Sequence, residues 1–135
     1  MVTGRSLALA YLEKAQKRLR VLEVLLEEQA YSDVVREAQE VVELALKAML
    51  RLVGVEPPKQ HDVGGLLVDH SSRFVEDVRQ ELPVLAATSK WLRKEREFAF
   101  YGDVDFIPTE EYSLADAQRA DREARHVVHV ALRCI

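Results

Sequence analysis

Apolar residues recur along the first part of the chain at steps of three and four, the spacing that places side chains on one face of an α-helix. The first such stripe lies within residues 5–29 and consists of Leu7, Tyr11, Ala15, Leu19, Leu22 and Leu26. Ala30, Tyr31 and Ser32 then break the pattern. Ser32 is placed to cap a second helix that carries Asp33 in its first turn. We therefore expect two consecutive helices in this part of the chain.

Residues 33–53 carry the clearest helical pattern. The apolar stripe of this second helix consists of Val35, Ala38, Val42, Ala45, Met49 and Leu52. Gly54 follows in the position that often takes a left-handed conformation after a helix, and Pro57 and Pro58 prevent continuation. Residues 55–61, including His61, are therefore predicted to form a loop.

The next part of the chain predicts one short helix and one long helix. Asp62 can cap a short helix over roughly residues 63–74, which the Gly64-Gly65 pair weakens. Pro83 is tolerated near the first turn of the following helix. We expect that helix to end at Gly102, the next glycine along the chain.

An acidic and aromatic segment, residues 103–112, is predicted to be a loop before the last helix. Ser113 and Asp116 form a variant capping box that opens this helix. Its stripe consists of Leu114, Ala117, Asp121, Ala124, Val128, Ala131 and Ile135. Four long helices and one short helix with short connections predict an all-α, antiparallel, up-and-down bundle forming a single domain over residues 1–135.

Composition and charge narrow the range of functions. Apolar residues make up 48% of the chain and charged residues 31%, as in a folded globule. We find neither an apolar run of transmembrane length nor a secretory signal, and the single Cys134 has no internal disulfide partner. We therefore expect a cytoplasmic protein without membrane contact. Because the net charge is −4, nucleic acid could be bound only through a local basic patch.

Three segments, taken together and in order, resemble the HEPN family. They are Ala38-Gln39-Glu40 with Glu43-Leu44-Ala45-Leu46-Lys47-Ala48-Met49-Leu50, Gly54 with Pro58-Lys59-Gln60-His61-Asp62-Val63 and Leu66-Leu67, and Arg96-Glu97-Phe98-Ala99-Phe100-Tyr101-Gly102-Asp103 with Tyr112. The resemblance implies a helical bundle that binds nucleotide or RNA and pairs as a homodimer. It also implies a minimal nucleotidyltransferase as partner, in a toxin–antitoxin type of pair.

Catalytically active HEPN proteins are metal-independent ribonucleases marked by an Arg, four to six residues, and then a His. Arg96 matches the Arg, but Tyr101 follows after four residues and Asp103 after six. Tyrosine, with a pKa of about 10, is a poor general base at neutral pH, whereas histidine, at about 6.5, is well placed. Loss of a general base typically lowers the rate by about 10²–10⁴. The leading interpretation is therefore a binding module without a cofactor. The alternatives are a ribonuclease that uses Arg96, Tyr101 and Asp103, and a non-catalytic interaction bundle.

The densest basic cluster lies just before and within the third HEPN-like segment. The candidate nucleotide- or RNA-binding residues are Lys90, Arg93, Lys94, Arg96, Tyr101 and Asp103. One guanidinium group can bind phosphate through two parallel N–H···O hydrogen bonds, and the ring of Trp91 or Phe98 could stack on a base. Two structural interpretations stay open. The cluster could be a solvated helix face with Trp91 in the core, or Arg96 could pair with Asp103 across a subunit interface.

Two further expectations concern metals and self-association. Glu123 and His126 have the spacing of a di-iron bundle ligand pair, but that fold needs a second such motif, so no metal site is expected. Several apolar residues lie outside the main stripes, and some of them are expected to be buried against another copy of the chain. These residues are Val41, Leu46, Phe98, Phe100, Val127 and Val130.

Overall fold

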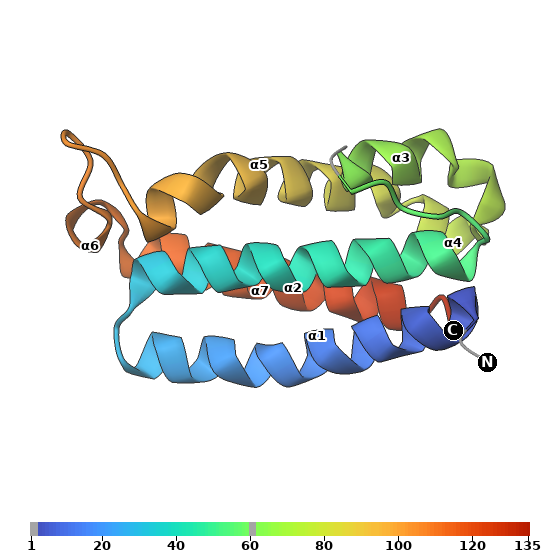
Figure 1. Ribbon diagram of the computed structural model, residues 1–135, viewed down its shortest axis with the longest axis horizontal. Helices are drawn as coiled ribbons and strands as arrows, with labels where there is room; N and C mark the ends of the chain where they lie inside the picture. The colour runs from blue at the N-terminus through green and yellow to red at the C-terminus, as the bar shows by residue number, and fades with distance from the viewer. Residues whose placement is uncertain (1–2, 60–61) are drawn as a thin grey trace.

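The computed structural model describes residues 3–59 and 62–135, and only the backbone of Glu97. His61 therefore lies outside the described residues. Four long helices alternate in direction and lie side by side (Figure 1), which confirms the predicted all-α bundle. They are α1 (Gly4–Glu27), α2 (Tyr31–Leu52), α5 (Leu82–Phe100) and α7 (Leu114–Leu132).

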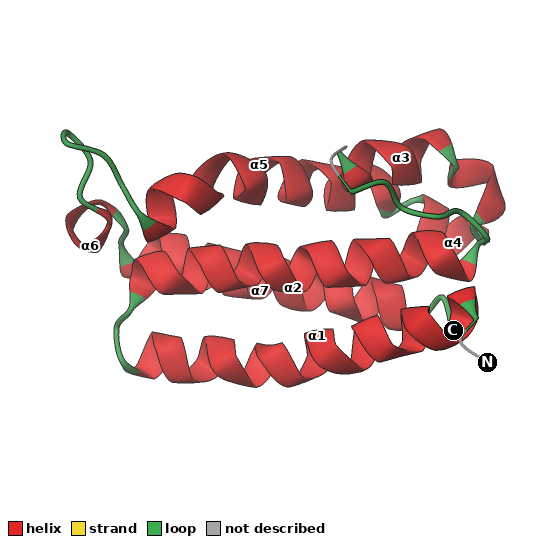
Figure 2. Ribbon diagram, viewed as in Figure 1, coloured by secondary structure: helices red, strands yellow, loops and turns green. Residues whose placement is uncertain are grey.

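The connections contain more short helical segments than the single one predicted. These segments are α3 (Val63–Asp69), the 3₁₀ turn η1 (Ser71–Arg73), α4 (Glu76–Arg79) and α6 (Pro108–Glu111). The expected short helix over residues 63–74 thus divides into α3 and η1. Within the predicted loop 103–112, Pro108 occupies the first position of α6, where a missing backbone N–H costs nothing. The described residues form helices and loops (Figure 2), with one isolated bridge between Asp103 and Phe106.

The three capping predictions have different outcomes in the structure. Ser113 and Asp116 form the predicted capping box, with 2.8 Å between the Ser113 backbone nitrogen and the Asp116 carboxylate. The prediction for Ser32 is wrong, because α2 begins at Tyr31, two residues before the predicted start, and Ser32 is buried within its first turn. Asp62 occupies the N-cap position of α3, but its side chain makes no capping hydrogen bond and instead lies 3.4 Å from Arg93.

Helix α2 is the centre of the bundle, because it packs against α1, α5 and α7. It is therefore buried on more sides than one apolar stripe would suggest, and Val41 and Leu46 are fully buried in a single copy of the chain. Val127 and Val130 of α7 are buried in the same core. These four residues are therefore part of the core of one copy, whereas Phe98 and Phe100 of the same predicted set are exposed.

Glycines at two helix ends adopt the left-handed conformation that the sequence predicted. Gly54 has φ +82° and Gly102 has φ +72°. At Gly102 a Cβ atom would lie 2.4 Å from the Phe106 carbonyl oxygen and 2.6 Å from Pro108 Cδ. Only glycine therefore lets the following loop fold back against the end of α5, which places Tyr101 at that end.

The helices fall short of the requirements of a membrane span. Within residues 3–59 and 62–135, none of them is both long and apolar enough to cross a bilayer.

Candidate functional site

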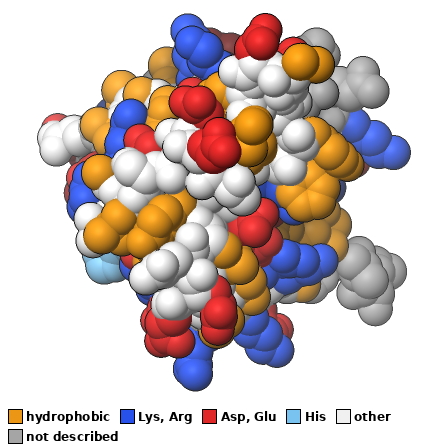
Figure 3. Space-filling view, turned by 90° about the vertical axis from the view of Figure 1, so that its left-hand side faces the viewer, with side chains coloured by type: hydrophobic (Ala, Val, Ile, Leu, Met, Phe, Trp, Pro, Cys, Tyr) orange, Lys and Arg blue, Asp and Glu red, His pale blue; other side chains and the backbone are white. Residues whose placement is uncertain are grey.

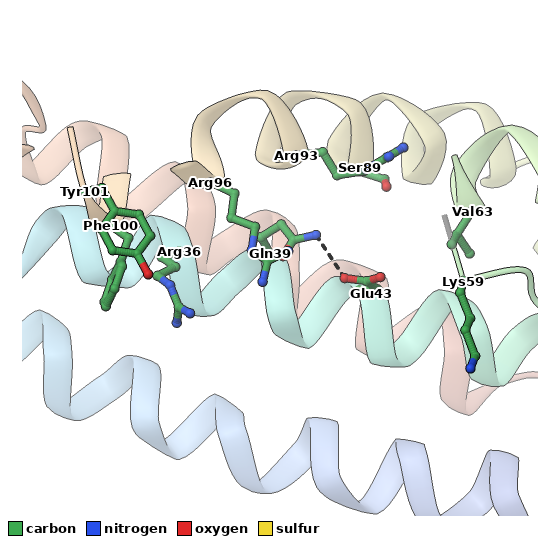
Figure 4. Close-up of a pocket in the computed structure, with 10 residues that line it drawn as sticks. All are labelled: Arg36, Gln39, Glu43, Lys59, Val63, Ser89, Arg93, Arg96, Phe100 and Tyr101. Carbon is green, nitrogen blue, oxygen red and sulfur yellow. Dashed lines mark hydrogen bonds between the residues drawn. The ribbon is translucent and has the colours of Figure 1, made fainter. Parts of the chain in front are cut away.

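A pocket of about 490 Å³ lies between α2 and α5, with Lys59 and Val63 at one end (Figure 4). This volume is within the range of small-molecule sites in proteins. The lining residues are Arg36, Gln39, Glu43, Lys59, Val63, Ser89, Arg93, Arg96, Phe100 and Tyr101. The pocket combines one polar stripe of α2 with one polar stripe of α5.

Positive charge is concentrated at this pocket. Four of its ten lining residues are Lys or Arg, and one is acidic, although the chain as a whole has a net charge of −4. Arg96 Nη2 lies 2.8 Å from Glu40 Oε1, and the Arg36 guanidinium lies 4.2 Å from the centre of the Phe100 ring. These arginines are oriented by neighbours on the facing helices, so the pocket presents ordered hydrogen-bond donors.

The floor of the pocket is polar and buried. Gln39 is 4% exposed and Ser89 is 5% exposed. The Gln39 amide nitrogen donates to Glu43 Oε2 at 3.2 Å, and Lys47 lies 3.2 Å from the other oxygen of Glu43. Burial acts to raise the pKa of Glu43, but hydrogen bonds from Lys47 and Gln39 outweigh it and lower that pKa. Glu43 is thus held as a carboxylate beneath the cations.

One atom of this floor has no partner. The side-chain oxygen Oε1 of Gln39 is buried and accepts no hydrogen bond from any residue that the structure describes. Buried side-chain oxygens are usually satisfied, since an unpaired one costs about 1–3 kcal/mol. The other faces of this helix are apolar, and an apolar side chain at position 39 would avoid that cost.

The structure separates the predicted binding residues into two groups. Arg93, Arg96 and Tyr101 line the pocket, whereas Lys90 and Lys94 are exposed on another side of α5. Helix geometry explains the separation: residues 89, 93, 96 and 100 share one stripe, and positions 90 and 94 are rotated from its centre by roughly 90° and 130°. Basic residues that are close together in the sequence therefore do not all belong to the pocket.

Asp103, the last predicted site residue, has a local role in the turn after α5. Its backbone pairs with Phe106, and its carboxylate accepts a hydrogen bond of 2.7 Å from the Val104 backbone nitrogen. Within the chain, Arg96 pairs with Glu40 of α2. The pairing within the chain is thus between helices, across the pocket edge.

Trp91 packs against the edge of the core and does not line the pocket. It is half-buried, and the Arg119 guanidinium of α7 lies 3.7 Å from the centre of its ring. Phe98 packs edge-to-face on Phe106. Phe100 and Tyr101 are therefore the aromatic residues available to a ligand in the pocket.

Sequence reasoning did not find the part of the site that α2 and the following loop contribute. A signal was present: Arg36, Gln39 and Glu43 recur at steps of three and four on a helix whose other faces are apolar. These positions match the polar stripe of α5, but nothing in the sequence shows that the two stripes face each other.

The candidate metal pair on α7 has other partners. Glu123 accepts hydrogen bonds from Thr88 at 3.0 Å and from Arg119 at 2.6 Å, and His126 lies 3.0 Å from Glu81. No group of three or more His, Cys, Asp or Glu side chains suited to a metal ion occurs in the described part of the chain.

Comparison with known proteins identifies the class. Residues 8–135 match the HEPN domain, so the chain belongs to the HEPN family. It is 27% identical over 127 residues to the protein named "Putative toxin MJ1304" from Methanocaldococcus jannaschii, which covers 89% of this chain and 82% of that protein. The crystal structure of TT1696 from Thermus thermophilus has the same fold, with a TM-score of 0.74 and 22% identity. That match covers 95% of this chain and 98% of the other.

Proposed function

We propose that this HEPN protein binds a nucleotide, free or as part of an RNA chain, in the pocket between α2 and α5. The observation that carries the proposal is the concentration of Arg36, Lys59, Arg93 and Arg96 around one cavity in an acidic chain. Arginine side chains bind phosphate oxygens with paired N–H groups, and lysine adds a point charge.

The aromatic residues at the pocket support a nucleotide over a simple anion. Phe100 is 47% exposed and Tyr101 is 77% exposed, so both offer ring surface. Base–aromatic stacking contributes about 1–3 kcal/mol per base and tolerates any base. Cations beside exposed rings are the combination that recognises the charged and flat parts of a nucleotide.

Binding without strong catalysis is the version that we favour. Tyr101 and Asp103 stand at the two spacings where active members of the family would carry a histidine, and neither has an imidazole to act as a base near neutral pH. A metal-independent ribonuclease is the second candidate. It is favoured by the relative named as a toxin and by the position of Arg96 at the pocket.

The proposed biological setting is a toxin–antitoxin type of pair with a minimal nucleotidyltransferase, and the proposed assembly is a homodimer. The end of the bundle with the α5–α6 loop supports the assembly, because apolar side chains are exposed there in patches between charged groups (Figure 3). We name this surface the apolar tip; it consists of Phe98, Val104, Ile107 and Leu114. Exposed apolar patches of this kind are typical of protein interfaces.

Calorimetry with adenosine, guanosine, cytidine and uridine 5′-monophosphates and a short single-stranded RNA tests the proposal. Arg93→Ala should weaken binding by at least about tenfold, because a charge-assisted hydrogen bond to phosphate is lost. Arg122→Ala, which removes an exposed arginine of α7 outside the pocket, should leave affinity unchanged. Equal affinities for wild type and Arg93→Ala, or no binding of any probe, would exclude this pocket as the nucleotide site.

A further inference from the structure

We infer that Gln39 is a specificity-determining residue of the pocket, and that its side-chain oxygen accepts a hydrogen bond from a sugar hydroxyl of a ribonucleotide. This inference rests on the proposed function and deepens it, because it names the sugar as the part of the ligand that the buried residues of the pocket recognise. It starts from the one buried oxygen of the floor that has no partner among the described residues.

The environment of Gln39 fixes which of its atoms is free. Its amide nitrogen is used by Glu43, at 3.2 Å, and Glu43 is itself held by Lys47. Rotating the amide to satisfy the oxygen would place that oxygen against the Glu43 carboxylate, which accepts only. The acceptor of Gln39 therefore has no donor among the described residues, and a ligand could supply one.

The missing donor defines the chemistry of the ligand. A phosphate dianion has no N–H or O–H group to offer, so it can satisfy the arginines but not Gln39. Ser89 lies on the opposite wall, is 5% exposed, and can both donate and accept. Donors around the opening and acceptors at the floor together suit a ligand that carries both a phosphate and hydroxyl groups.

The order of the side chains along the pocket assigns the three parts of a nucleotide. Figure 4 shows Phe100 and Tyr101 at one end, Gln39 in the middle, and Arg93 followed by Lys59 toward the other end. A base at the aromatic end and a phosphate at the Arg93 end place the sugar over Gln39. The 2′- and 3′-hydroxyls are the donors that a ribose presents there.

Ligand access requires movement of the side chains that border the pocket. Gln39 Oε1 is buried in the structure, whereas the side chains of Arg93 and Arg96 are 44% and 47% exposed. Long, partly exposed arginines change rotamer readily on the picosecond-to-nanosecond timescale. The ligand phosphate would draw these side chains from Asp62 and Glu40, and so uncover the floor.

The test compares each ribonucleoside 5′-monophosphate with its 2′,3′-dideoxy counterpart by calorimetry, with inorganic phosphate as competitor. Wild-type protein should bind the ribose form at least about fivefold more tightly, the value of one net hydrogen bond. Gln39→Met, which keeps length but removes the acceptor, should bind both forms equally. Phosphate should compete equally well with wild type and variant. The control Gln118→Met, on the exposed face of α7, should keep the preference for ribose.

Melting of the free protein separates a binding role from a structural one. If Gln39 serves the ligand, Gln39→Met should melt near the wild-type temperature, because removal of the unpaired buried oxygen offsets loss of the hydrogen bond to Glu43. Ser89→Ala gives a second variant, and it should reduce the preference for ribose without abolishing phosphate competition.

Three results would overturn the inference. Equal affinity of the wild-type protein for the ribose and dideoxy forms would exclude recognition of the sugar hydroxyls by the pocket. Nucleotide binding through the phosphate, and hence the proposed function, would still stand. A ribose preference that persists in Gln39→Met would show that another residue recognises the sugar hydroxyls. Absence of any nucleotide binding by wild type would exclude both the inference and the proposed function.

Discussion

Arg96 of α5 and Glu40 of α2 form an ion pair at the edge of the pocket, with 2.8 Å between Nη2 and Oε1. The pair joins the helix that supplies the HEPN-like arginine to the central helix of the bundle. It also occupies the guanidinium that a phosphate would need. Any anion entering the pocket therefore competes with Glu40 for Arg96.

Replacing Glu40 with glutamine should strengthen nucleotide binding, because Arg96 would no longer be neutralised. Both side chains are partly exposed, so the pair is worth about 0.2–1 kcal/mol, which corresponds to an affinity gain of up to about fivefold. Calorimetry on Glu40→Gln measures the gain, and Glu27→Gln on the exposed face of α1 is the matched control. Weaker binding by Glu40→Gln would show that Glu40 positions Arg96 instead of competing for it.

Replacing Gly102 with alanine should lower the free energy of unfolding by about 1–3 kcal/mol or more. The cause is the left-handed φ of +72° together with the contact of 2.4 Å between a Cβ atom and the Phe106 carbonyl oxygen. Urea denaturation checks the change in unfolding free energy. Gly4→Ala has no atom within 4 Å of its new methyl group and should be neutral or stabilising. Equal midpoints for the two variants would contradict the turn geometry.

Native protein should cleave RNA weakly or not at all in EDTA, and Tyr101→His should cleave it measurably if the missing base limits the rate. Tyr101 is 77% exposed at the end of α5, so histidine fits there without repacking. A restored base could recover part of a factor of about 10²–10⁴. Gel-based cleavage of a labelled RNA measures the rates. Cleavage must disappear on Arg96→Ala, and strong Arg96-dependent cleavage by the native chain would make the ribonuclease the better proposal.

Cys134 should react slowly with iodoacetamide while the protein is folded. Burial raises the pKa of its thiol from an ordinary 9.0 to about 11, so the thiol form persists at neutral pH. Between pH 7 and 8 the reactive thiolate is then roughly a hundredfold scarcer than in an exposed cysteine. Mass spectrometry follows alkylation, and urea-unfolded protein is the control. Similar rates in folded and unfolded protein would show that this site is open.

Self-association should depend on the apolar tip. Val104 is 91% exposed within it, so Val104→Asp places a charge in the proposed interface without touching the core. Sedimentation should show a dimer for the wild type at micromolar concentration and a shift toward monomer for the variant. Val24→Asp on α1, where the valine is 55% exposed, should leave the dimer unchanged. A strictly monomeric wild type would contradict the homodimer.

The sequence by itself determined the helices and several of their ends, because both depend on nearby residues. Apolar spacing and helix-end signals predicted the four long helices, and Ser113, Gly54 and Gly102 marked termini that the structure confirms. Local signals were weaker where a residue had a competing tertiary partner. Asp62 is one example, since its carboxylate lies near Arg93 and makes no capping bond in α3.

Only the tertiary structure decided which side chains share the pocket. Arg36 and Gln39 lie more than fifty residues before Arg93 and Arg96, and they meet because packing places one stripe of α2 against one stripe of α5. Helix rotation likewise separated Lys90 from its charged neighbours in the sequence. Spacing along the chain shows which residues share a face of their own helix. Which other helix face lies opposite depends on how all the helices pack in the core. The Gln39 oxygen, which has no partner among the described residues, is buried only when this core forms, so the sequence does not show it.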